Sequence, residues 1–156
     1  MATYTTTRAA STFPVFTGSG SGTLRVAYGV YEHASNLAAA TIIEYCKVPA
    51  GAVIIGGWFR GDDLDTGTEE LDIDIGYAAN GDVAADPDAF GNFDVITGDV
   101  VTSLKPEVTI LYPLNGTLKD GPVTLTRETT IIGTINVDAA TGGTGTSWVC
   151  VFYVVP

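Results

Sequence analysis

The sequence predicts an all-β protein, either a β-sandwich or a barrel, and two observations carry this prediction. About eight or nine short segments are apolar or alternate apolar with polar residues, and turn residues separate them. No segment has the length and pattern of an ordinary helix, and short strands joined by turns are typical of sandwiches and barrels. Glycine, at 19 of 156 residues, is also more frequent than usual, which fits many turns.

Length and composition indicate one folded domain with an acidic surface. A chain of 156 residues can build a two-layer core without metals or disulfides. Its hydrophobic content of 46% argues against disorder, although the net charge is −11. Lys and Arg number 7 against 18 Asp and Glu, so the surface would repel a phosphate backbone. We therefore expect no direct binding to nucleic acid.

The chain shows neither a membrane span nor a secretion signal. No apolar run approaches the roughly 20 residues that cross a bilayer. The opening residues, MATYTTTRAASTFPVFTG, contain no apolar core of signal-peptide length. Membrane insertion and export by that route are therefore not expected.

The two cysteines, Cys46 and Cys150, fall on separate expected strands. A disulfide between them would require those strands to be neighbours, which the sequence does not reveal. We expect two small, buried and reduced side chains instead.

Residues 1–23 are predicted to form a flexible N-terminal arm, and residues 24–156 to form the sandwich. Thr, Ser, Ala and Gly dominate the arm, which ends in the linker-like GSGSGT. Arg8 is its one charged side chain. An apolar island lies farther along the arm and consists of Phe13, Pro14, Val15 and Phe16. The arm is either a disordered tail or an element that docks on a partner, and both alternatives stay open here.

Period-two patterns and turn residues place the strands. In LRVAYGVYE, residues 24–32, the alternate apolar residues from Leu24 to Val30 share one face. A tight turn is expected at 49–51, because proline fixes one backbone angle and glycine accepts unusual ones. The expected strands are 24–32, 40–48, 52–60, 71–78, 93–97, 107–112, 122–126, 130–139 and 147–155.

Two acidic motifs are interpreted from local pattern. In LDIDIGYA, Asp72 and Asp74 alternate with apolar residues, so one face of this strand is expected to be buried and the other wet and acidic. DPDAF, residues 86–90, is expected as a single helical turn, with Asp86 as N-cap and Pro87 at the first position.

No motif indicates catalysis. His33 is the single histidine and lies beside Glu32 in an expected turn, where we expect it to be solvated. There is no G-x-S-x-G nucleophile elbow and no second histidine for a metal site. The clusters GSGSG and GGTGT lack the lysine of a phosphate-binding loop. We therefore expect no catalytic residue, no metal, no cofactor and no enzymatic activity.

Carboxylates concentrate in one part of the chain, between Asp62 and Asp99. No Lys or Arg occurs from Gly61 to Leu104. The stretch DDLDTGTEELD offers oxygen ligands that suit calcium, but its spacing does not match an EF-hand. A solvated acidic surface, which keeps the protein soluble and its strand edges apart, is the favoured interpretation.

Four stretches together resemble a family of small structural proteins, the head-decoration or cement proteins of tailed bacteriophages. These stretches are VPAGAVIIGG, LDIDIGYA, ADPDAF and the closing GGTGTSWVCVFYVV. The resemblance spans roughly residues 24–155 and rests on turn and strand motifs. It implies a jelly-roll β-sandwich of about eight strands and does not cover the predicted N-terminal arm.

The resemblance also implies a function. Such a protein would decorate and stabilise an assembled capsid by binding the major capsid protein, as a homotrimer on the outer surface of the virion. It would be made in the host cytoplasm. The arm, with Arg8 and the island from Phe13 to Phe16, is the expected partner-binding element.

A second function class stays open, namely a carbohydrate- or receptor-binding jelly-roll module of a phage tail or fibre. Sugar rings stack on exposed aromatic side chains, and such a platform would be drawn from Trp58, Phe59, Tyr77 and Trp148. Trp58 and Trp148 lie in strongly apolar strands, so we expect both in the core.

Overall fold

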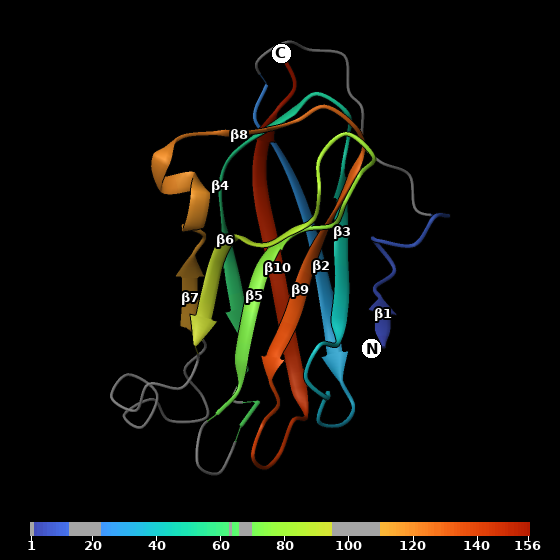
Figure 1. Cartoon of the computed structure of the whole chain (residues 1–156), viewed down its shortest axis with the longest axis vertical. Helices are drawn as coiled ribbons and strands as arrows, with labels where there is room; N and C mark the ends of the chain where they lie inside the picture. Colours follow the sequence, from blue (N-terminus) through green and yellow to red (C-terminus); the bar gives the residue numbers. More distant parts are fainter. Residues whose placement is uncertain (1, 13–22, 63, 66–69, 95–109) are drawn as a thin grey trace.

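Two β-sheets pack face to face in the computed structural model (Figure 1). The structure describes residues 2–12, 23–62, 64–65, 70–94 and 110–156. The elements within these ranges are β1 (Thr3–Thr5), β2 (Arg25–His33), β3 (Ile42–Val48), β4 (Ala52–Gly61), β5 (Asp72–Tyr77), β6 (Asp86–Asp94), β7 (Ile110–Pro113), the 3₁₀ helix η1 (Gly116–Asp120), β8 (Val123–Leu125), β9 (Thr129–Val137) and β10 (Gly145–Val154).

The strand order confirms the expected fold class. One sheet has the order β1-β3-β9-β5-β6, and the other has the order β2-β10-β4-β7, with β8 also pairing with β4. Apart from the parallel pair β1–β3, these pairs are antiparallel. Without β1 and β8, the two four-stranded sheets have the order of an eight-stranded jelly roll.

The core lies between the sheets and consists of alternate residues of the strands. Along β10, Val149, Val151 and Tyr153 are buried in it. The largest fully buried side chains include Tyr45 and Phe59. Burial of each large apolar side chain contributes about 1.5–3 kcal/mol, so this layer supplies most of the driving force for folding.

Strands β2 and β3, from different sheets, converge along one side of the sandwich. A Cβ on Gly29 would lie 1.9 Å from the backbone oxygen of Tyr45. Only glycine permits this approach, which lets the two edge regions meet. β2 therefore has room only for glycine at position 29, although Tyr31 and His33 farther along the strand also turn inward.

The expected helical turn at 86–90 is wrong, because these residues begin β6. Asp86 pairs with Tyr77 of β5, and a Cβ on Gly76 would lie 2.1 Å from the backbone oxygen of Asp86. Pro87 is tolerated because β6 is an edge strand, where one row of backbone groups needs no partner.

Both cysteines are free and buried. Burial raises the pKa of the Cys46 and Cys150 thiols, which keeps them protonated and unreactive. Within the described part of the chain, no helix has the length and apolar character needed to cross a bilayer.

Candidate interaction surface

Three large apolar side chains of strand β2 point away from the core. Val26, Tyr28 and Val30 are 52%, 37% and 47% exposed, and Leu24, just before the strand, is 58% exposed. The period-two prediction that these residues share a face is confirmed, and the shared face is the outer one. Gly29, which faces inward, is the local signal for this orientation.

Neighbouring strands extend this outer face across the sheet. On β10, Trp148 lies opposite Val30, and Phe152 lies opposite Val26. Ile55 of β4 is 48% exposed. We call this surface the apolar face, and it consists of Leu24, Val26, Tyr28, Val30, Val53, Ile55, Trp58, Trp148 and Phe152. Because exposed apolar patches of this size are often functional, the apolar face is the candidate interaction surface.

The outer face of the other sheet is polar. Asp72 and Asp74 of β5 both accept a hydrogen bond from the side-chain amide of Asn92, at 2.9 and 2.8 Å. Glu44 of β3 accepts a hydrogen bond from the Thr5 hydroxyl at 2.7 Å. The sandwich therefore has one apolar and one polar, acidic outer face, which distinguishes the two sheets chemically.

Two of the acids expected to be solvated are buried. Asp65 is 6% exposed, and its carboxylate accepts hydrogen bonds from the backbone N–H groups of Glu70 and Leu71 and of Ala140 and Thr141. Asp65 thus ties two loops together at one end of the sandwich. Asp74 is 8% exposed beside Asn92. The expectation of a uniformly wet acidic stretch is therefore wrong at these two positions.

No described group of three or more His, Cys, Asp or Glu residues could hold a metal ion. Asp65 already directs its oxygens at four backbone N–H groups. The Asp65 carboxylate therefore joins two loops and does not form part of an open metal-binding site.

His33 is the last residue of β2 and is buried, so the expectation of a solvated turn histidine is wrong. Its Nε2 lies 2.7 Å from the Ser147 hydroxyl, which lies 2.6 Å from the Tyr45 hydroxyl. Burial lowers the pKa of His33 to about 4, although the negative charges of Glu32 and Asp62 act to raise it. Ser147 is fully buried, so a substrate cannot reach this serine–histidine pair.

Sequence reasoning missed this polar network. The three side chains come from β2, β3 and β10, which are far apart in the chain, and no local pattern connects them. Burial also raises the pKa of the Tyr45 hydroxyl, despite its hydrogen bond to Ser147. The network satisfies buried polar groups with one another, which is a structural role.

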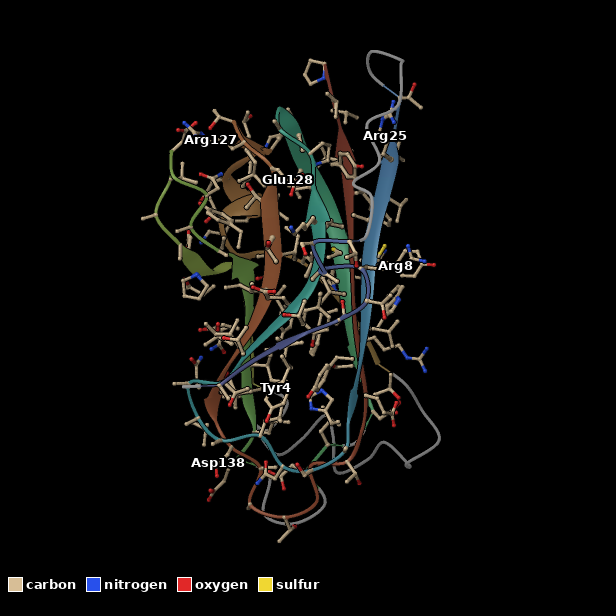
Figure 2. The ribbon with its side chains drawn as sticks, turned by 90° about the vertical axis from the view of Figure 1, so that its right-hand side faces the viewer. Tyr4, Arg8, Arg25, Arg127, Glu128 and Asp138 are labelled. Carbon is tan, nitrogen blue, oxygen red and sulfur yellow. The ribbon has the colours of Figure 1, made fainter. Side chains whose placement is uncertain are left out.

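The described part of the predicted arm lies on the edge of the sandwich (Figure 2). Residues Thr3–Thr5 form β1 and pair with β3. The Arg8 guanidinium then lies 3.9 Å from the centre of the Tyr28 ring and donates a hydrogen bond to its hydroxyl at 2.6 Å. The island of Phe13, Pro14, Val15 and Phe16 lies outside the described residues. The partner-binding role of the arm stays a prediction.

The four candidate aromatic residues do not form one platform. Phe59 is in the core, and Tyr77 packs beside Phe90 with ring centres 5.9 Å apart. Trp58 and Trp148 were expected in the core, but both are half-buried on the apolar face. The reason is alternation, since their neighbours Phe59 and Val149 occupy the inward positions.

These features define an all-β jelly-roll sandwich with one apolar outer face. No protein-family model matches the sequence, and no curated protein shows significant similarity to it. Solved structures do resemble it. A chain in the capsid structure of Ralstonia phage GP4 aligns over 99% of both chains, with a TM-score of 0.74 and 17% identity.

Two further structures show the same fold. A chain in the capsid asymmetric unit of cyanophage Pam1 aligns over 94% of both chains, with a TM-score of 0.66 and 22% identity. A chain in the acid-stable capsid structure of Helicobacter pylori bacteriophage KHP30 covers 88% of this chain and 91% of its own, with a TM-score of 0.59 and 12% identity. At these identities the likeness concerns the fold.

Proposed function

We propose that this protein is a structural component of a tailed-phage virion that decorates and stabilises the assembled capsid by binding the major capsid protein. The observation that carries the proposal is the nearly full-length structural match to chains of phage capsid structures. The apolar face supports a role in assembly, because exposed apolar patches of this size are often contact surfaces with other protein molecules. The site of action would be the outer surface of the virion, after synthesis in the host cytoplasm.

The proposal assigns no enzymatic role. The serine–histidine pair is sealed in the core, and Asp65 is committed to backbone N–H groups. A decoration protein needs shape, stability and adhesive surface rather than a reactive centre. The described residues supply these through the core between the sheets and through the apolar face.

The arm is proposed as a second element of capsid binding, in the context of a homotrimer. Its first part is anchored by β1 and by Arg8, which lies on Tyr28 of the apolar face. Burial of the apolar side chains of the island that follows this anchor would contribute about 1.5–3 kcal/mol for each large one. Several arms acting together in a trimer would multiply this modest affinity.

Sedimentation with capsid shells that lack this protein tests the proposal. Purified protein should co-sediment with the shells and saturate at a fixed ratio to the major capsid protein. A double variant with Phe13→Ser and Phe16→Ser should keep the melting temperature of the wild type and bind the shells more weakly. Failure of the wild-type protein to sediment with shells at any concentration would refute capsid decoration.

The alternative of a carbohydrate- or receptor-binding module rests on Trp58 and Trp148, which are half-buried on the apolar face. Cys150 pairs in register with Trp58, so the two tryptophans are diagonal neighbours on adjacent strands. Copy number separates the two functions. Quantitative mass spectrometry of virions should find this chain in numbers comparable with the capsid protein, whereas a tail module would be present in a few copies.

A further inference from the structure

We propose that the apolar face of the β2-β10-β4 sheet is the contact between copies of this chain. The proposal goes beyond decoration, because it names the surface and the partner and requires no capsid. Three properties of the face support a second copy as the partner that binds it. These are the area of the face, its low content of acids, and the lack of another broad apolar patch among the described residues.

The area of the apolar face is sufficient for a specific contact. Its five exposed side chains, at 37–58% exposure, and its half-buried ones present on the order of 600 Å² of apolar surface. Two copies that bury this face against each other would remove about 1,200 Å² from water, which reaches the range of stable specific interfaces. The strands present it as one continuous sheet surface, a geometry that sheets use when they pack face to face.

Charge allows identical copies to approach at this face. Each chain carries a net charge of −11, so two copies repel through most of their surfaces. Strands β2, β4 and β10 together contain a single acid, Glu32, which accepts a hydrogen bond from the Thr146 hydroxyl at 2.7 Å. Arg60 is exposed near the end of β4, and Arg8 lies over Tyr28. The strands that carry the face therefore contain few acids in an otherwise acidic molecule.

A second copy offers matching apolar surface at only one place among the described residues. Outside the apolar face, the exposed large apolar side chains are Tyr4 on β1 and Val137 on β9, and neither belongs to a broad patch. The apolar face of one copy therefore meets the apolar face of another.

A pair of matched substitutions tests the contact. Val26 on the apolar face and Val137 on the other sheet are both strand valines, 52% and 42% exposed. Light scattering and sedimentation velocity, over about a hundredfold range of concentration, should show that the wild type self-associates. Val26→Lys should weaken this association about a hundredfold or more, and Val137→Lys should leave it unchanged.

A wild-type protein that remains monomeric over this range overturns the proposal. Equal effects of the two substitutions, or no effect of Val26→Lys, also overturn it. These results would leave capsid decoration standing, since shell binding is measured separately. Conversely, self-association through this face without shell binding would refute decoration alone.

Footprinting of the wild-type protein tests the contact without any substitution, so its result does not depend on whether a variant folds. Hydroxyl-radical labelling at low and high concentration should show protection of Trp148, Phe152 and Tyr28 as copies associate. Tyr4, which is 42% exposed on β1, is the internal control and should label equally at both concentrations. Unchanged labelling of the face as association proceeds would contradict the proposal.

Discussion

His33, Tyr45 and Ser147 place a titratable group inside an otherwise apolar core. The imidazole is buried, and its pKa falls to about 4 from the ordinary value near 6.5 because burial penalises the charged form. Between these two values the unfolded chain binds more protons at His33 than the folded chain does. The contribution of neutral His33 to the free energy of unfolding is therefore complete above about pH 6.5. It is lost as the pH drops toward 4.

This linkage gives a prediction for acid stability. At pH 5, His33 should reduce the free energy of unfolding by about 2 kcal/mol relative to neutral pH. The side chain in His33→Gln does not titrate, so the free energy of unfolding of this variant should differ much less between neutral pH and pH 5. Urea denaturation of both proteins at pH 7.5 and pH 5 measures it. An equal fall of stability in the variant and the wild type would show that His33 is not the responsible group.

At the scale of the strands, the convergence of β2 and β3 depends on Gly29. A methyl group at this position would lie 1.9 Å from the Tyr45 backbone oxygen, so one strand would have to move. The same contact fixes which face of β2 is outward. The apolar face is therefore a consequence of how the edge of the sandwich closes.

Gly29→Ala should destabilise the fold by about 3 kcal/mol. The added methyl group would clash with backbone atoms of Tyr45, which cannot move aside as a flexible side chain would. Gly56→Ala is the matched control, since its added Cβ would meet Phe152 at an ordinary 3.9 Å. Thermal and urea denaturation should show a large loss for the first variant and little for the second. Similar losses in both would contradict the close approach of β2 and β3.

Alternation and turn residues were sufficient to predict most strands, because these signals are local. The residues from Leu24 to Val30 were correctly assigned to one face, but alternation does not say which face meets the core. That choice depends on Gly29 and its distant neighbour Tyr45. The helical turn at 86–90 failed for a similar reason, since the Asp-Pro signal is local while the pairing of Asp86 with Tyr77 is not.

The candidate site was less accessible from the sequence than the fold was. Trp58 and Trp148 occupy apolar strands, and only the buried positions of Phe59 and Val149 show that the indoles lie outward. Asp65 resembled its acidic neighbours in the sequence. Its structural role depends on backbone N–H groups of residues 140 and 141, which the fold brings to it.

At the scale of the whole molecule, the outer faces of the two sheets differ in chemical character. The β1-β3-β9-β5-β6 sheet carries the acids Glu44, Asp72 and Asp74, and the β2-β10-β4 strands carry the apolar face. An acidic outer surface keeps the protein soluble, and the apolar face gives it a place to adhere. This asymmetry is expected of a protein whose copies meet through one sheet and expose the other sheet to solvent.

Cryo-electron microscopy of shells to which the purified protein has been added tests the central claim most directly. We expect sandwich-shaped density at regular positions on the outer surface of the shell. We also expect the β2-β10-β4 face to be buried in contacts between copies and the acidic sheet to face solvent. Shells without added density, or bound copies whose apolar face points into solvent, would contradict it.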